Sequence, residues 1–274
     1  MLLHGLFGSK LNFNSFAKAI HAPRCIVADL RNHGSSPHHD DMSIEAMVAD
    51  TLHLMDEIGI EEWVLVGHSL GGKVAMATAL MHPDRVRKMG CIDMAPVDYL
   101  SVESPKNRDG YSTRDVVELV HSIHLAQEGI TNRKEADALL QKRAPWLSEG
   151  LRAFLLQSAH ERSDGTWGWK MNVGAIMRCY PQLAGWEYPA SLTYHQPSLF
   201  IKGSESRFIE NHYLPAIYEH FPNALLEVIP DAGHWVHSEK PRETLELLND
   251  FIAASDEADR EGAPMDTEGR YRAA

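Results

Sequence analysis

The sequence predicts an α/β fold: a mostly parallel sheet with flanking helices, interrupted by an inserted helical lid. Short apolar, β-branched runs alternate with longer stretches of helical periodicity, which is typical of parallel strands joined by crossover helices. The alternation stops at residue 97, shows no evident strand up to residue 196, and then resumes. We therefore divide the chain into a core of two parts, 1–97 and 197–254, a lid over 98–196 and a disordered acidic tail over 255–274.

Residues that begin or end helices indicate where the elements of the core lie along the chain. Ser43 can cap a helix whose apolar residues recur at helical spacing, and Gly59 can end it. A helix from about Leu70 to Met81 directly follows a strand and ends at the pair His82-Pro83. In chain order we expect strands over 24–29, 63–67, 86–93, 197–203 and 225–229, and helices over 43–58, 70–81, 209–221 and 241–252.

Composition and charge narrow the class of protein. The chain has 274 residues, 44% hydrophobic and 23% charged, which is ordinary for a globular protein. Its 26 Lys and Arg against 38 Asp and Glu give a net charge of −12, which would repel a phosphate backbone, so we expect no nucleic-acid partner. No apolar run approaches the ~18 residues that a membrane span needs. Three cysteines, an odd number without a C-x-x-C pair, favour a reducing intracellular compartment.

The strongest chemical signal is G-H-S-L-G at residues 67–71, which fits G-x-S-x-G between a predicted strand and a predicted helix. The chain must turn sharply at Ser69, and the flanking glycines let the backbone crowd there, while Gly72 allows close packing of helix and sheet. The turn exposes the hydroxyl at a helix N-terminus, where free N–H groups stabilise negative charge. We predict Ser69 as a nucleophile; the alternative is a loop serine that only caps the helix.

A serine nucleophile needs a base and an acid that orients the base. His234 is the best base, because it follows the last predicted strand in the segment D-A-G-H-W and can reach back over the strand ends. Asp93, at the end of a strand, is the favoured acid, and Glu205 in the turn after strand 197–203 is the alternative. Asp98 is a weaker third choice. His68, beside the nucleophile, is expected to pack under the turn.

An oxyanion hole needs two backbone N–H groups aimed at one point. Leu70, directly after the nucleophile, supplies the first. The turn H-G-L-F-G at residues 4–8 supplies the second, from Leu6 or Phe7, because its glycines let main chain approach a substrate. We expect His4 to brace this turn.

Together these motifs resemble the α/β-hydrolase superfamily over nearly the whole ordered length. The motifs that carry the resemblance are H-G-L-F-G-S at 4–9, D-L-R-N-H-G-S-S at 29–36, G-H-S-L-G-G at 67–72 and A-G-H-W-V-H at 232–237. Within the superfamily the chain is most similar to the abhydrolase-domain-11 subfamily, with its bacterial esterases and the yeast ethanol acetyltransferases. That similarity includes I-D-M-A-P at 92–96, W-K-M-N at 169–172 and F-I-K-G at 200–203.

The resemblance implies more than the residues show by themselves. It implies the α/β-hydrolase fold. In this subfamily the acid follows the strand that comes after the helix at the nucleophile, here the predicted helix 70–81, and Asp93 stands at that position. It implies two further strands upstream of His4, so we expect the first two strands of the fold to be missing here, which would affect stability more than chemistry. Members in eukaryotes are usually mitochondrial, although no targeting segment is evident in this sequence.

We therefore predict a serine hydrolase that cleaves small carboxylic esters or thioesters through Ser69, His234 and Asp93 and an acyl-enzyme. One alternative is an alcohol acyltransferase that uses the same acyl-enzyme, and another is a non-catalytic binding protein. No cofactor is predicted, and the segment H-H-D-D at 38–41 is interpreted as a solvated acidic loop rather than a metal site. Trp167 and Trp169 either line an acyl pocket or pin lid helices together.

Overall fold

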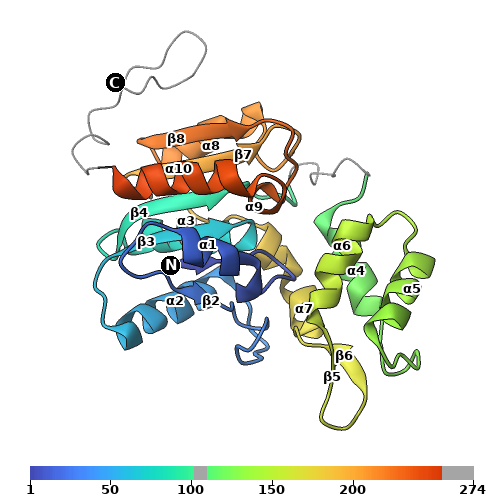
Figure 1. Cartoon of the computed structure of the whole chain (residues 1–274). Coiled ribbons are helices and arrows are strands. Elements are labelled where there is room, and N and C mark those ends of the chain that lie inside the picture. Colours follow the sequence, from blue (N-terminus) through green and yellow to red (C-terminus); the bar gives the residue numbers. More distant parts are fainter. Residues whose placement is uncertain (102–109, 255–274) are drawn as a thin grey trace.

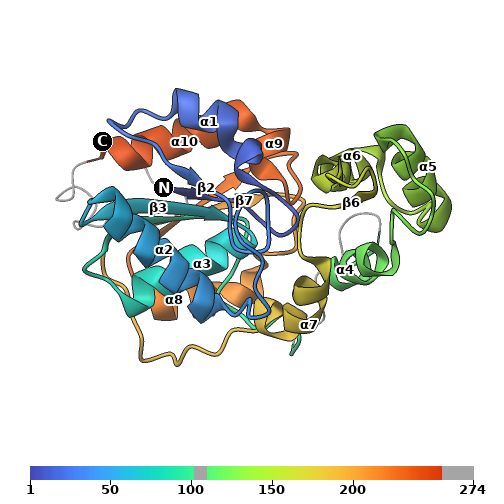
Figure 2. The same ribbon diagram turned by 90° about the horizontal axis from the view of Figure 1, so that it is seen from below.

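One six-stranded parallel sheet forms the centre of the molecule, with helices on both faces (Figures 1 and 2). The computed structural model describes residues 1–101 and 110–254; the predicted tail over 255–274 lies outside them. In spatial order the strands are β2 (Val27–Ala28), β1 (Leu2–Leu3), β3 (Trp63–His68), β4 (Val86–Ile92), β7 (Ser198–Gly203) and β8 (Ala224–Ile229). Every neighbouring pair in this sheet is parallel, which confirms the predicted α/β fold.

Two layers of helices bury the two faces of the sheet (Figure 2). One face carries α1 (Asn14–Ala19), α9 (Val236–Glu239) and α10 (Pro241–Ala253), and the other carries α2 (Ile44–Ile58), α3 (Leu70–Met81) and α8 (Leu214–His220). Every residue of α3 from Leu70 to Leu80 is buried. A helix that is apolar nearly all round belongs in the interior, so α3 is a rigid support for whatever lies at its start.

The chain between β4 and β7 adds a mostly helical segment beside the sheet. Its elements are α4 (Thr113–Ser122), α5 (Arg133–Arg143), α6 (Glu149–Leu155), β5 (Ala159–Glu161), β6 (Trp167–Trp169) and α7 (Val173–Ala184). Both views place α7 between the sheet and the other helices of this segment. No helix in the described parts of the chain is long and apolar enough to cross a membrane.

The expectation of a strand-free segment is wrong at one place, because β5 and β6 pair as an antiparallel hairpin. Each strand has three residues, too few for an alternating pattern to stand out in the sequence. The turn between them uses Gly165 at a φ of 79°.

Other boundaries differ from the predictions for local reasons. Strand β2 has two residues instead of the predicted 24–29, because only that part lies opposite the equally short β1. The helix predicted over 209–221 is a 3₁₀ turn, Asn211–Tyr213, followed by α8. The short helix α1 was not predicted. The Ser43 hydroxyl caps α2 and Gly59 ends it at a φ of 72°, as expected.

Candidate active site

Three residues that are distant in sequence meet at the carboxyl ends of the strands. Ser69 follows β3, Asp93 follows β4, and His234 lies in the loop after β8. The Ser69 Oγ lies 3.0 Å from His234 Nε2, and His234 Nδ1 lies 2.7 Å from Asp93 Oδ2. When a hydroxyl, an imidazole and a carboxylate are in contact in this order, a proton can pass from the hydroxyl to the ring. The carboxylate then stabilises the resulting imidazolium.

Close backbone packing forces the turn at Ser69. Its φ of 53° and ψ of −116° lie outside the regions that L side chains usually adopt. A Cβ at Gly67 would lie 2.0 Å from the carbonyl oxygen of Gly71, and one at Gly71 would lie 2.4 Å from that of Leu3. Both positions therefore require glycine, which is why the turn can be recognised in the sequence.

Asp93 is fully buried and has several hydrogen-bond donors around its carboxylate. Besides the imidazole, Oδ2 accepts a hydrogen bond from the Ser206 hydroxyl, and Oδ1 accepts one from the backbone N–H of Gly203 at 3.3 Å. Glu205, next to Ser206, is exposed, so the carboxylate that contacts the imidazole is that of Asp93. Asp98 is bound by the backbone N–H of Leu100 instead.

The His234 ring lies between aromatic neighbours. Phe208 stacks on it with ring centres 3.9 Å apart, and His68 lies against it at 4.8 Å. The Nε2–H of His68 donates to the backbone carbonyl of His234 at 2.9 Å, and burial lowers the pKa of His68 well below its usual value. A neutral His68 therefore holds the loop that carries His234, which agrees with its predicted packing role.

The turn at residues 4–8 borders the cavities at Ser69 and has one backbone N–H without an acceptor among the described residues. The N–H of Phe7 donates to His33 Nε2 at 3.2 Å, so it is already engaged. The N–H of Leu6 has no acceptor among the described residues, and Leu6 borders the same cavities as Ser69. Leu70, the first residue of α3, has the second free N–H, as first-turn residues of helices do.

Two buried neutral histidines support this turn. The Leu30 N–H donates to His4 Nε2 at 3.0 Å, so the Nδ1–H of His4 donates to the Gly5 carbonyl at 2.8 Å. His33 accepts from Phe7 and donates from Nδ1 to the Arg31 carbonyl at 3.0 Å. Burial lowers the pKa of His4 to about 4 and that of His33 to about 3. Both rings need an unprotonated nitrogen to make these contacts.

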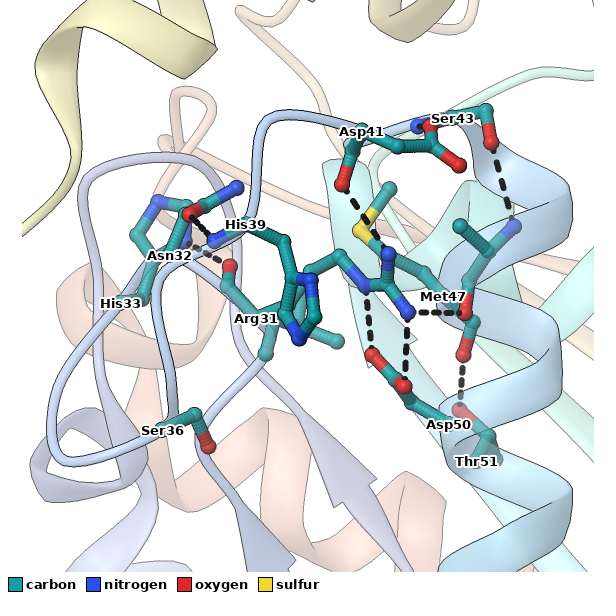
Figure 3. Close-up of polar contacts among 12 residues, drawn as sticks. Arg31, Asn32, His33, Ser36, His39, Asp41, Ser43, Met47, Asp50 and Thr51 are labelled. Atoms are coloured by element: carbon teal, nitrogen blue, oxygen red, sulfur yellow. Dashed lines mark hydrogen bonds and ion pairs between the residues drawn. The ribbon is translucent and has the colours of Figure 1, made fainter.

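The loop that carries His33 is anchored to α2 by an arginine (Figure 3). Arg31 makes two hydrogen bonds to the carboxylate of Asp50, at 2.6 and 2.8 Å, and others to the carbonyls of Asp41 and Ala46. Asn32, at a φ of 66°, accepts the backbone N–H of His39 at 2.8 Å on its side-chain oxygen. The turn at residues 4–8 thus rests on a loop that is itself held at several points.

The segment at 38–41 contacts residues of the inserted segment. His38 Nε2 donates to the Lys170 carbonyl at 2.9 Å, and Asp40 forms an ion pair with Arg178 at 2.6 Å. These contacts join the loop to the inserted segment. Among the described residues no three His, Cys, Asp or Glu side chains are grouped as metal ligands.

Two largely apolar cavities meet at Ser69. The first is lined by Leu6, Ser69, Leu70, Lys73, Met94, Tyr99, Thr113, Tyr180, Leu183, Ala184 and Phe208. The second is lined by Leu6, Phe7, His68, Ser69, Tyr111, Ser112, Thr113, Val116, Leu151, Phe208, His234 and Trp235. Neither Trp167 nor Trp169 lines them; the Trp169 indole donates to the Ile123 carbonyl at 3.0 Å, which ties β6 to the end of α4.

Sequence reasoning missed three residues at the site: Ser206, Phe208 and Lys73. Ser206 and Phe208 lie in the turn after β7, in which Glu205 was the only residue considered. Lys73 carried a readable signal, since it is the single charged residue in the otherwise apolar helix L-G-G-K-V-A-M-A-T-A-L-M. A charge inside a buried helix must have a partner or a role.

Known proteins of similar sequence or structure include a lipase and esterases. A family profile described as alpha/beta hydrolase fold matches residues 1–105 and 104–241. The chain is 36% identical over 258 residues to the sn-1-specific diacylglycerol lipase ABHD11 of Mus musculus, covering 92% of this chain and 80% of the relative. It is 34% identical over 255 residues to esterase YbfF of Escherichia coli, covering 92% of each. A solved marine microorganism esterase superposes with a TM-score of 0.81 at 32% identity, covering 91% of this chain and 93% of that one.

Proposed function

Because the chain belongs to the α/β-hydrolase fold family and is a carboxylic ester hydrolase, we propose that Ser69, His234 and Asp93 form its catalytic triad. The similarity to ABHD11 and to a bacterial esterase confirms the resemblance drawn from the motifs. The observation that carries the triad is the continuous contact from Ser69 Oγ through the His234 ring to Asp93.

In the first half-reaction Ser69 Oγ attacks the carbonyl carbon of the ester while His234 Nε2 takes the hydroxyl proton. The carbonyl oxygen becomes an oxyanion, which the N–H groups of Leu6 and Leu70 bind. When the intermediate collapses, the bond from carbon to the alcohol oxygen breaks, and His234 donates its proton to that oxygen. Asp93 stays ionised and stabilises the imidazolium between these steps.

In the second half-reaction water replaces the alcohol. His234 takes a proton from water as its oxygen attacks the acyl carbon, and the same two N–H groups bind the new oxyanion. The bond from the acyl carbon to Ser69 Oγ then breaks, and the proton returns from His234 to the serine. The base His234 and the nucleophile Ser69 are then both restored, and the carboxylic acid leaves.

The two cavities support an ester with an apolar group on each side of its carbonyl. His234 lines the second cavity, and the leaving oxygen must lie near His234 Nε2 to receive a proton, so the alcohol group belongs there. The acyl group then occupies the first cavity, behind Leu70 and Met94. The name of the mouse relative makes diacylglycerol one ester to test.

The decisive experiment is Ser69→Ala, which we expect to lower hydrolysis of p-nitrophenyl acetate by roughly 10⁴-fold or more, because it removes the nucleophile. A fluorophosphonate probe should label the wild type at Ser69 and leave the variant unlabelled. Ser238→Ala, at an exposed serine on α9, is the control and should keep full activity. Full hydrolysis by the Ser69→Ala variant would overturn the proposal, and unlabelled wild type would favour a non-catalytic binding protein.

The same acyl-enzyme could be intercepted by an alcohol, so products should be analysed with ethanol and an acetyl donor present. Ethyl acetate exceeding acetate would make acyl transfer the main reaction. A mitochondrial location, implied by the resemblance, stays a prediction that microscopy of the tagged protein can test.

A further inference from the structure

Helix α7 is attached at both ends to the parts of the core that carry the site. At its start, Asn172 caps the helix through its side-chain oxygen, and its Nδ2 donates to the side-chain oxygen of Asn32 at 3.1 Å. The backbone N–H of Asn172 donates to the Asn32 carbonyl at 2.9 Å. Asn32 is the neighbour of His33, which holds the oxyanion turn. The start of α7 is therefore fixed to the loop behind the oxyanion hole.

At its end, α7 is held by the ammonium group of Lys73. Its Nζ donates to the carbonyls of Ala184 and Gly185 at 2.6 Å each, and it lies 3.4 Å from the carbonyl of Val97. Val97 lies where the inserted segment leaves the core, and Gly185 lies just after α7. Lys73 is one turn after Ser69 on α3, so a single side chain joins the start of the inserted segment and the end of α7 to the helix that begins at the proposed nucleophile.

The amino group of Lys73 is buried and has several partners. The side chain is 1% exposed, and burial lowers its pKa to about 7. The last carbonyls of a helix carry the negative end of its dipole, which favours a cation at this place. The Tyr99 ring lies 5.0 Å from Nζ and adds a cation–π contact. Without the ammonium group, buried carbonyls at the end of α7 would lose their donor.

Lys73 and the end of α7 also form part of the wall of the first cavity. Lys73, Tyr180, Leu183 and Ala184 line this cavity together with Ser69. We propose that Lys73 is a positioning residue that fixes the end of α7 against the nucleophile helix and so determines which acyl chains the first cavity accepts. This inference rests on the proposed function, because it takes the first cavity as the acyl side. Helix α7 is then a fixed wall of the cavity, and the site opens by movement of helices α4 to α6.

The chain offers a matched control in Lys88 on β4. It is fully buried too, and its Nζ donates to the carbonyls of Phe251 and Ala254 at the end of α10, at 2.9 and 2.8 Å. Its ammonium lies 5.3 Å from the Phe251 ring. Lys88 lines neither cavity at Ser69. Lys73→Met and Lys88→Met therefore remove the same kind of interaction, one beside the acyl cavity and one away from it.

The test is the ratio of kcat/KM for p-nitrophenyl hexanoate to that for p-nitrophenyl acetate. We expect Lys73→Met to change this ratio by roughly ten-fold, while Lys88→Met stays within about two-fold of the wild type. Lys73→Gln, which keeps two N–H donors, should restore part of the wild-type ratio. Equal ratios in Lys73→Met, Lys88→Met and the wild type would show that Lys73 is merely structural.

Hydrogen exchange of the wild type tests the same inference without a variant. We expect the amides of α7 to exchange as slowly as those of α3, and those of α4 to α6 to exchange faster. Exchange of α7 at the rate of α4 to α6 would overturn the inference even if the Lys73 variants fail to fold. Labelling of Ser69 by the fluorophosphonate probe decides the proposed function separately.

Discussion

Three residues at the site have backbone angles that L side chains rarely adopt. Phe7, Ser69 and Asp93 have φ values of 65°, 53° and 54°. Each such residue costs of order 1–3 kcal/mol and persists only where its surroundings hold it. The glycines around Ser69 made its turn visible in the sequence. Nothing local marks Phe7 or Asp93, because the carbonyls, amides and rings that hold them come from distant parts of the chain.

The acid of the proposed triad can be tested by paired carboxylate substitutions. Asp93→Asn keeps the shape of the side chain but cannot stabilise an imidazolium, so we expect kcat to fall by about 10⁴-fold. Glu205→Gln, in the exposed turn beside Ser206, should leave kcat within about three-fold of the wild type. Steady-state kinetics on p-nitrophenyl acetate measures both. If Glu205→Gln were the crippling change, the assignment of the acid would be wrong.

Secondary-structure elements were predictable where they repeat a pattern for several turns or pairs. The strands of the sheet centre and helices α2, α3 and α10 follow from apolar periodicity and from caps such as Ser43 and Gly59. Short elements were missed or misplaced. Strands β5 and β6 and helix α1 are too short for a period to appear, and tertiary contacts determine them. The meeting of Ser69, Asp93 and His234 was predictable, because parallel strands bring their carboxyl ends to one edge.

Close packing between α3 and the sheet gives a prediction at the scale of a helix. In Gly71→Ala the new Cβ would lie 2.4 Å from the Leu3 carbonyl oxygen, so we expect loss of soluble, active protein or a fall in stability of several kcal/mol. Gly150→Ala, in α6, meets nothing within 4 Å and should raise the free energy of unfolding by up to about 1 kcal/mol. Urea unfolding compares the two. Equal stability in both variants would contradict the packing argument.

Buried neutral histidines tie the stability of the whole molecule to pH. Burial lowers the pKa of His4 to about 4 and the pKa values of His33 and His237 to about 3. In the unfolded chain these groups bind protons below about pH 6.5, whereas in the folded chain they stay neutral. The unfolded state therefore binds more protons as pH falls below 6.5, and the free energy of unfolding decreases.

We expect full stability above about pH 6.5 and a loss of about 2 kcal/mol per buried histidine at pH 5. Thermal unfolding between pH 7.5 and 5 measures the loss. His237→Phe, which replaces a ring stacked on Phe13 at 4.9 Å, should make Tm less dependent on pH. His53→Gln, at an exposed histidine, should leave that dependence unchanged. The same pH dependence in the wild type and both variants would refute the linkage.

Phe208 borders both cavities and also stacks on the ring of His234. A substitution of Phe208 would therefore change both cavities and the surroundings of the proposed base at the same time. To change one cavity without the other, substitutions must be made at other residues. Leu183 borders only the first chamber of the two and Leu151 only the second, so they are the positions from which each half of a substrate can be selected by itself.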